Sequence, residues 1–102
     1  MPVMFKKMLM WRERYLLLVE DGYYIGGLMN NAFCDSQDKK FYELKNAKII
    51  IEKDECLIFI IHNDESLVQL KCKTYADKMA LINKMNEVIY KISEKTPLVM
   101  II

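Results

Sequence analysis

The sequence is poor in residues that interrupt or cross-link a fold. Its 102 residues include three glycines, two prolines, one histidine and three cysteines. Together with 53% apolar residues, this excludes a disordered chain and is typical of one packed domain. The cysteines are odd in number, widely spaced and without a C-x-x-C pair, which argues against a disulfide framework or a zinc site. Three reduced thiols fit an intracellular compartment.

Long apolar runs and a strong net charge are also missing. No run approaches the ~20 residues that span a bilayer, and no secretory signal precedes the first apolar stretch. The formal net charge is +1, so overall charge predicts neither a nucleic-acid binder nor a binder of acidic ligands. Residues 1–15 hold four cations and one acid, whereas residues 52–65 hold five acids and one lysine. Either the molecule is electrically polarised or both segments are ordinary solvated surface.

Seven short apolar segments, separated by polar breaks, predict consecutive antiparallel strands. Between two of them, Asp21-Gly22 indicates a hairpin, because glycine accepts the positive φ of a tight turn. The return strand begins at Tyr23 and meets Gly26-Gly27, which we expect to bulge or bend it. Residues 30–40 are polar and are expected to form a loop. The seven segments are residues 2–10, 11–19, 23–25, 41–44, 47–52, 56–62 and 67–73.

After residue 73 the apolar spacing changes to that of a helix. Thr74, followed three residues later by Asp77, is a plausible capping box, and Pro97 limits continuation. We expect one amphipathic helix of about 18 residues with Lys78 on its wet face. Its apolar stripe, which we assign to core packing rather than to a partner groove, consists of Tyr75, Met79, Ile82, Met85, Ile89 and Ile92.

These elements predict an α+β, mainly β fold: a seven-stranded antiparallel bent sheet or partial barrel, capped by one C-terminal amphipathic helix. One domain is expected over residues 1–102, with strands over about 3–73, the helix over about 75–92 and an apolar tail over 97–102. The tail is expected to pack on a sheet edge, contact a partner or simply mark the end of the chain. The start so close to the first strand suggests a piece of a longer protein.

The order of these elements resembles that of a pleckstrin homology (PH) domain over about residues 3–93. Residues 10–22, MWRERYLLLVEDG, are similar to that family's second strand and following turn. The sequences FYEL (41–44), LIFI (57–60) and LVQLKCK (67–73) resemble its fourth, sixth and seventh strands. Leu81 stands where most such domains carry a helix tryptophan. The resemblance implies phospholipid headgroup binding, as in some members, or protein binding, as in others.

Lipid-binding members resemble K-x(n)-[KR]-x-R across the first two strands, and Lys7, Arg12 and Arg14 match those positions. Residues i and i+2 on a strand share a face, so the two arginines can point together and contact phosphate in a bidentate manner. Two arginines on a solvated strand end are an equally good interpretation. The predicted headgroup-binding residues are Lys6, Lys7, Arg12, Arg14, Lys39 and Lys40.

Met8, Leu9 and Met10 are predicted to enter the membrane interface if they cap the first hairpin. The alternative is that these residues alternate across the first strand and at least one side is core. Each cation near a membrane surface contributes about 1 kcal/mol, so four cations give at most a few kcal/mol. Such binding is marginal alone and needs a second anchor outside this chain.

Three departures from the lipid-binding pattern predict weak binding with modest headgroup selectivity. Only four residues separate Lys7 from Arg12, where phosphoinositide-selective members usually have a longer loop. The third strand has Gly26-Gly27 where such members tend to offer a tyrosine and a following cation. Asp64 and Glu65, near the same mouth in the family, would repel an anionic headgroup.

No enzymatic chemistry, metal or cofactor is predicted. The sequence has no nucleophile with a base at recognisable spacing, and His62 is expected at the surface or at a strand end. We therefore expect a non-catalytic, cytoplasmic module, peripherally associated with anionic membranes and not with nucleic acid. The alternative is a protein-interaction scaffold of the same fold without specific lipid binding, using a sheet edge or the tail residues Leu98, Val99, Met100, Ile101 and Ile102.

Overall fold

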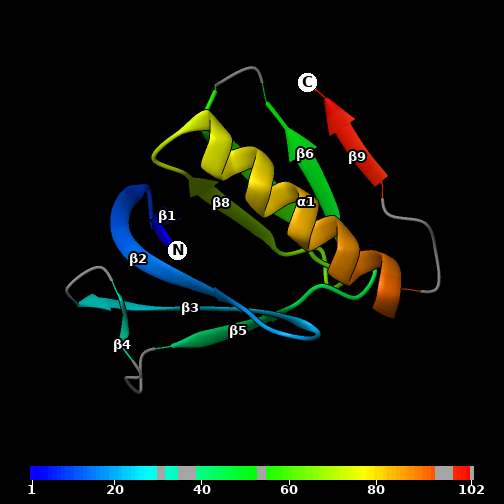
Figure 1. Ribbon diagram of the computed structural model, residues 1–102, viewed down its shortest axis with the longest axis horizontal. Helices are drawn as coiled ribbons and strands as arrows, with labels where there is room; N and C mark the ends of the chain where they lie inside the picture. Colours follow the sequence, from blue (N-terminus) through cyan, green and yellow to red (C-terminus); the bar gives the residue numbers. More distant parts are fainter. Residues whose placement is uncertain (30–31, 35–38, 53–54, 94–97, 102) are drawn as a thin grey trace.

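The computed structural model describes residues 1–29, 32–34, 39–52, 55–93 and 98–101, which form one sheet and one helix (Figure 1). The sheet order is β4-β3-β2-β1-β8-β7-β6-β9, and β5 pairs with β3. The elements are β1 (Pro2–Lys7), β2 (Met10–Leu18), β3 (Gly22–Met29), β4 (Ala32–Cys34), β5 (Lys40–Glu43), β6 (Lys48–Ile51), β7 (Leu57–Ile61), β8 (Leu67–Lys71), α1 (Tyr75–Ile92) and β9 (Leu98–Ile101).

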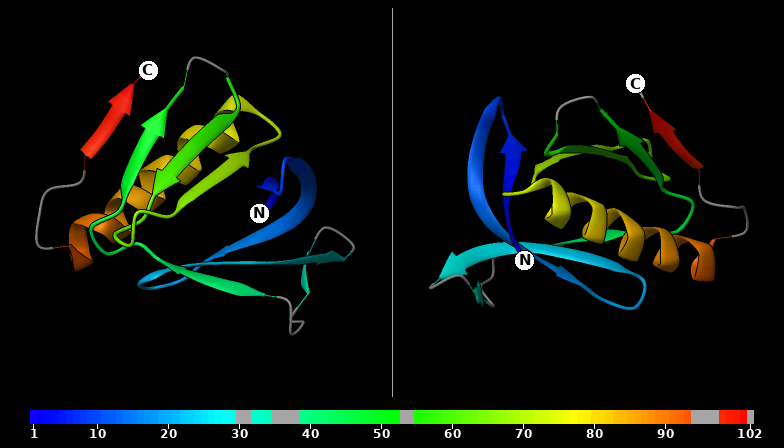
Figure 2. Two further views of the ribbon diagram at one scale, coloured as in Figure 1. Left: turned by 180° about the vertical axis from the view of Figure 1, so that it is seen from behind. Right: turned by 45° about the horizontal axis from the view of Figure 1, so that its top comes forward.

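The predicted fold class is confirmed. The seven predicted strands correspond to β1, β2, β3, β5, β6, β7 and β8, which pair in antiparallel fashion, and the predicted helix corresponds to α1. The sheet bends, and α1 lies across one face of β6, β7 and β8, in front of these strands in Figure 1 and behind them in the left view of Figure 2. The helix therefore covers the core that the bent sheet leaves open.

Every second side chain of β7 and β8 points into the core. Ile58 and Ile60 of β7 pair with Leu70 and Val68 of β8, and all four side chains are buried. Since successive strand residues point to opposite faces, this pairing places one apolar face toward the helix. Leu81, at the position of the usual helix tryptophan, is also buried. The helix buries Lys78, Leu81, Ile82, Met85 and Ile89.

The start of α1 agrees with the predicted cap, because the Thr74 hydroxyl accepts a hydrogen bond from the Asp77 amide at 3.0 Å. Two expectations for the first turn were wrong. Tyr75, assigned to the apolar stripe, is 56% exposed, whereas Lys78, assigned to the wet face, is only 1% exposed. The ammonium of Lys78 donates to the Glu52 carbonyl oxygen at 3.4 Å and lies 6.0 Å from the Tyr75 ring centre. A long aliphatic stem lets a lysine pack inside while its charged end reaches a polar group.

The hairpin predicted at Asp21-Gly22 joins β2 to β3, with Leu18 opposite Tyr23. The reason given for its glycine was wrong, since Gly22 does not have a positive φ. A Cβ atom at Gly22 would instead collide with the Tyr42 carbonyl oxygen of β5. Glycine is therefore required here for the close approach of two strands, and β3 continues through Gly26-Gly27 to Met29.

Four described non-glycine residues have positive φ angles: Asn46 and Glu65, which lie in other turns, and two consecutive residues of the first hairpin. Lys7 pairs with Met10, and the two residues between them, Met8 and Leu9, have φ values of 52° and 69°. Two positive φ angles are the requirement of a type I′ turn, in which Asn-Gly is preferred. The left-handed conformation costs about 1–2 kcal/mol per residue for a side chain such as these.

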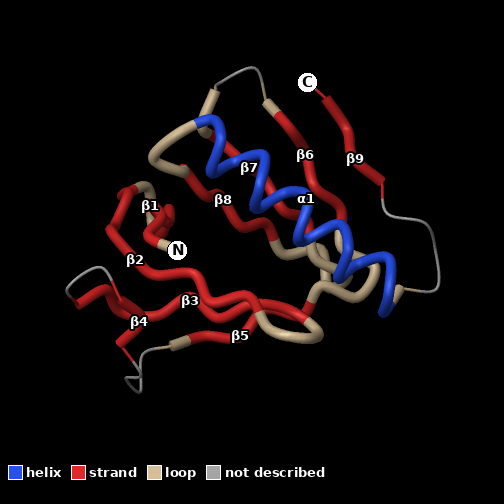
Figure 3. Tube along the Cα trace, in the orientation of Figure 1, coloured by secondary structure: helices blue, strands red, loops and turns tan. Residues whose placement is uncertain are grey.

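Two further strands lie in segments that were expected to be irregular. β4 falls within the predicted loop 30–40 and pairs with β3, while the residues of that loop at 30–31 and 35–38 lie outside the described part. β9 runs parallel to β6 at the edge of the sheet (Figure 3). Of the alternatives for the apolar tail, the structure shows packing on a sheet edge for residues 98–101. Residues 97 and 102 are outside the described part.

Candidate functional site

A cavity of about 390 Å³ gathers most of the basic residues that the sequence singled out. It lies between the first hairpin and the strands β3 and β5. It is lined by Phe5, Lys7, Arg12, Arg14, Ile25, Lys40 and Tyr42. We call it the basic cavity.

The register of the first hairpin explains which residues reach this cavity. Phe5 pairs with Arg12, and Val3 pairs with Arg14. Directly opposite residues of an antiparallel pair point to the same face, so both arginines share the face of the apolar residues that lead into the core. Lys7 lies two positions after Phe5 and points the same way. The cavity is thus the charged continuation of the core-facing side of β1 and β2.

The other wall comes from β3 and β5, where Ile25 pairs with Lys40. The Lys40 ammonium lies 5.0 Å from the Tyr42 ring centre, and the Phe5 and Tyr42 rings are 6.4 Å apart. The Arg14 guanidinium donates to the Glu13 carbonyl oxygen at 2.7 Å. Four of the seven described residues that line the cavity are cationic and none of those seven is acidic. The arrangement can attract and hydrogen-bond a phosphate group.

Two predicted cations lie elsewhere. The Lys6 ammonium is 5.8 Å from the Trp11 ring centre, on the opposite face of the hairpin from Lys7. The Lys39 ammonium is 5.5 Å from the Tyr24 ring centre. Lys71 of β8, which the sequence analysis did not single out, lies 5.5 Å from the Trp11 ring centre. Its position depends on the pairing of β1 with β8, which no local pattern reveals.

The tip of the first hairpin lies beside the basic cavity, since Lys7 lines the cavity and precedes the turn. Met8 and Leu9 are 87% and 89% exposed, and Met10 is exposed as well. The alternative prediction, that at least one of these three side chains packs in the core, was therefore wrong. An apolar, exposed tip is therefore flanked directly by cations.

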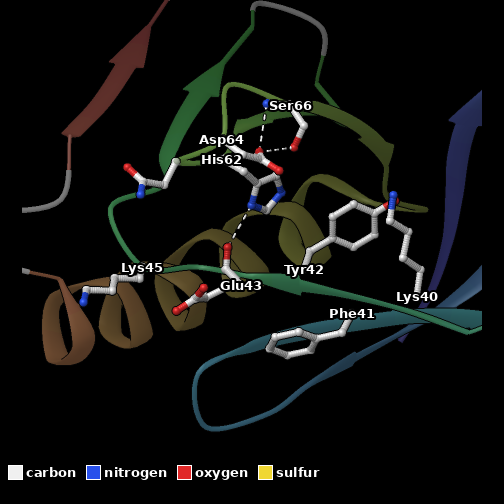
Figure 4. Close-up of a pocket in the computed structure, with 9 residues that line it drawn as sticks. Lys40, Phe41, Tyr42, Glu43, Lys45, His62, Asp64 and Ser66 are labelled. Atoms are coloured by element: carbon white, nitrogen blue, oxygen red, sulfur yellow. Dashed lines mark hydrogen bonds between the residues drawn. The ribbon is translucent and has the colours of Figure 1, made fainter.

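A second cavity of about 260 Å³ adjoins the first through Lys40 and Tyr42 (Figure 4). Its lining is of mixed charge, with Glu43, Lys45 and Asp64 in addition to Lys40. The Asp64 carboxylate accepts hydrogen bonds from the Ser66 hydroxyl at 2.6 Å and the Ser66 amide at 3.0 Å. These bonds lower the pKa of Asp64 and so stabilise its negative charge.

His62 lies on the wall of the second cavity and follows β7, so the strand-end position is as expected, but the side chain is only 6% exposed. Its Nδ1 lies 2.9 Å from the Glu43 carbonyl oxygen, and its Nε2 lies 2.8 Å from the Tyr23 hydroxyl. A carbonyl only accepts, so Nδ1 carries the proton and Nε2 of the neutral ring accepts from Tyr23. The Tyr42 ring stacks on His62 at 5.3 Å.

This network holds the imidazole in its neutral form. Burial is the main cause that lowers the pKa of His62 below its ordinary value of 6.5, and Lys40 acts in the same direction. The Glu43 carbonyl and Asp64 oppose this shift. Burial likewise raises the pKa of Tyr23, so its hydroxyl stays a donor. Protonation of His62 would convert Nε2 into a donor, so the Tyr23 hydroxyl would have to turn and accept instead, and a positive charge would be buried.

The described residues contain no group of three or more His, Cys, Asp or Glu side chains arranged to hold a metal ion. The one helix of the described residues, α1, is not long and apolar enough to cross a bilayer.

Comparison with known proteins places this geometry among solved structures. No family model and no curated protein sequence matches the chain. The C-terminal PH domain of pleckstrin is 18% identical, with a TM-score of 0.66 over 86% of this chain and 90% of that chain. The chain has the fold of a PH domain. A chain in the crystal structure of human RhoA in complex with the DH/PH fragment of PDZRHOGEF also matches, at 17% identity and a TM-score of 0.70, over 88% of this chain and 27% of that chain.

A third PH structure was solved with a ligand. It is the C-terminal PH domain of pleckstrin in complex with D-myo-Ins(1,2,3,4,5)P5, at 20% identity and a TM-score of 0.60, over 91% of this chain and 92% of that chain. At these identities the likeness establishes the PH fold and leaves the ligand of this chain to be argued from its own residues.

The buried histidine predicts an acid-sensitive fold. The pKa of His62 is lower in the folded state than in the unfolded chain, where it is about 6.5. As the pH falls below 6.5, the unfolded chain therefore binds a proton that the folded state does not, and the free energy of unfolding decreases. Because His62 is the only histidine, its imidazole signals in an NMR titration are unambiguous and should report a pKa below 6.5.

Urea unfolding of wild type and His62→Gln between about pH 7 and pH 5 isolates this contribution from that of the carboxylates. The wild type should lose more stability than the variant over this interval. Equal losses in the two proteins, together with an unshifted titration, would contradict the account of the network.

Proposed function

We propose that this domain is a non-catalytic membrane-targeting module that binds anionic phospholipid headgroups weakly through its first hairpin. The ligand class is a lipid phosphate, carried by a phosphoinositide, phosphatidic acid or phosphatidylserine. The observation that carries the proposal is the basic cavity, in which Lys7, Arg12, Arg14 and Lys40 face one space whose described lining has no acidic residue. Lys6 and Lys39 lie outside it and would act only as general surface charge.

Geometry supports phosphate as the recognised group. Arg12 and Arg14 share one face of β2, and each guanidinium offers a planar fork of donors suited to phosphate oxygens. Lys7 and Lys40 approach from two other strands, so the charge surrounds the cavity rather than lying along one edge. The PH domain that was solved with an inositol pentakisphosphate has the same fold, which is consistent with this assignment.

The hairpin tip supports a membrane rather than a free inositol phosphate as the source of that phosphate. Met8 and Leu9 combine nearly full exposure with a left-handed backbone that apolar residues adopt at a cost. Such strain persists where it serves a function. Insertion of the tip into the interface would remove its apolar surface from water while the cavity holds a headgroup.

Weak binding with modest selectivity follows from the surroundings of the cavity. The two-residue turn gives the first hairpin no extra chain with which to wrap a headgroup. The neighbouring cavity brings the negative charge of Asp64 close to Lys40, which disfavours additional phosphates on that side. We therefore infer that one phosphate is recognised and that a second membrane anchor outside this chain completes the attachment.

Liposome co-sedimentation tests the cationic part of the proposal. Arg12→Ala/Arg14→Ala should lower the affinity for vesicles of phosphatidylserine, phosphatidic acid or phosphoinositide by roughly tenfold to thirtyfold, since each cation near the surface contributes about 1 kcal/mol. The affinity is measured from the fraction of protein that pellets at each lipid concentration. The matched control is Lys48→Ala/Lys91→Ala, which removes the same charge from exposed positions on β6 and α1. Equal pelleting of wild type and the arginine variant, or no pelleting of either, would exclude the proposed function.

A second substitution tests the tip. Met8→Asn/Leu9→Gly installs the pair preferred in a type I′ turn and should raise the free energy of unfolding by about 1–2 kcal/mol, because it relieves the left-handed strain. The same variant should bind anionic vesicles less well, since it removes the exposed apolar side chains. If the tip serves membrane binding, the variant should have a higher free energy of unfolding and a lower affinity for vesicles than wild type. Urea unfolding and co-sedimentation of the same protein samples measure both; retained vesicle binding in a more stable variant would show that the tip does not insert.

A protein-interaction scaffold is the second candidate function. It is favoured by β9, an apolar strand at the edge of the sheet, because an edge strand can pair with a strand of another protein. The sedimentation experiment separates the two candidates: only the lipid-binding module pellets with anionic vesicles in an arginine-dependent way.

A further inference from the structure

Cys56 and Cys72 face each other at the open end of the β7–β8 hairpin. Leu57 pairs with Lys71, so the next positions outward, Cys56 and Cys72, are directly opposite. The Cys72 amide donates to the Cys56 carbonyl oxygen at 2.9 Å, which continues the ladder by one more pair. Two cysteines separated by fifteen residues in the chain are thereby cross-strand neighbours.

Both side chains lie on the core face of the hairpin. The buried pair of Ile58 and Leu70 is two positions further in, and residues i and i+2 of a strand share a face. In a hydrogen-bonded antiparallel pair the Cα atoms are about 5.5 Å apart, within the about 4.4–6.8 Å range of disulfides. The Cβ atoms of a hydrogen-bonded pair lie at the far end of the range, about 5.5 Å apart, so they must approach by roughly 1 Å to reach the Cβ separation of a disulfide.

The two thiols differ in environment. Cys56 is half-buried, whereas Cys72 is 4% exposed. Cys72 also lines a cavity of about 250 Å³ whose other lining residues are Pro2, Val3, Met4 and the charged Glu13, Lys71 and Lys73. Burial raises the pKa of the Cys72 thiol to about 11, and Asp77 and Cys56 add to the shift. The more accessible Cys56 is therefore the sulfur that an oxidant meets first, and Cys72 is positioned to react with the product.

We propose that Cys56 and Cys72 form a modification site at which a peroxide produces an intrachain disulfide. Cys56 first loses its proton, and the thiolate attacks one peroxide oxygen; the O–O bond breaks, a sulfenic acid forms, and the expelled hydroxide takes up that proton and leaves as water. The Cys72 sulfur then attacks the Cys56 sulfur; the S–S bond forms, and the sulfenic hydroxyl leaves as water with the Cys72 proton. In total, two thiols lose two electrons and two protons, and hydrogen peroxide is reduced to two waters. This inference is independent of the proposed lipid binding.

The test treats the full chain with hydrogen peroxide and follows free thiols, intact mass and disulfide-linked peptides without reduction. Two of the three thiols should be lost, the mass of the monomer should fall by two hydrogens, and peptide mapping should join Cys56 to Cys72. Cys34→Ser is the matched control and should form the same bond. Cys56→Ser and Cys72→Ala should not form it, and the first of these changes only a half-buried position, so it is expected to fold.

Stability gives a second readout. The bond closes the loop of residues 56–72 in the unfolded chain, so the urea midpoint of oxidised wild type should be higher than that of reduced wild type. Reductant should reverse this shift, and Cys56→Ser should show no shift. The proposal is overturned by a bond that includes Cys34, by cross-linked dimers, or by a Cys56 that oxidises further while Cys72 keeps its thiol.

Discussion

The two-residue turn at Met8 and Leu9 sets the register of the first hairpin, and the site depends on that register. With Lys7 opposite Met10, Phe5 falls opposite Arg12 and Val3 falls opposite Arg14. A shift of one residue would move every side chain of one strand to the other face. The arginines would then leave the core-facing side, and Trp11 would replace them. A single short turn therefore determines both the packing of β1 and β2 and the charge of the basic cavity.

The same face of the hairpin changes character along its length. Val3 is buried, Phe5 is half-buried, and Lys7 is exposed at the end of the strand. Apolar burial at one end anchors the hairpin to the core, and that anchoring holds the cations in place at the other. The two-residue turn at the tip requires two positive φ angles, for which asparagine and glycine are preferred. Met8 and Leu9 occupy it instead, so the backbone there is strained, while their side chains are suited to an apolar environment.

Local patterns predicted the parts of the fold that depend on neighbours in sequence. The helix was predicted at its observed bounds because its cap and its spacing of three and four residues lie within one segment. Motif resemblance and strand alternation predicted that Lys7, Arg12 and Arg14 lie together, and in the structure the three side chains line one cavity. Lys78 was misplaced because its burial depends on the carbonyl of Glu52, which lies in another segment.

Features that join distant segments were not predictable in this way. The buried bonds of His62 require β3, β5 and β7 to meet, and the pairing of β9 with β6 gives no signal in either sequence alone. The left-handed conformation of Met8 and Leu9 was also not predictable, because tight turns with positive φ prefer asparagine, aspartate and glycine. The sequence pattern pointed to Asp21-Gly22 for such a turn instead. The length of the connection, two residues between paired strands, requires the left-handed backbone at Met8 and Leu9, whatever the preference of the residues that occupy it.

The central claim is that the first hairpin enters the membrane interface, and Trp11 reports on it directly. It is the only tryptophan in the chain and lies beside the tip, with the ammonium groups of Lys6 and Lys71 5.8 Å and 5.5 Å from its ring centre. Its fluorescence should be measured with saturating anionic vesicles whose acyl chains carry bromine quenchers. The account predicts a shift of the emission to shorter wavelength and quenching by the brominated chains. Trp11 emission that stays unchanged in these vesicles would contradict it.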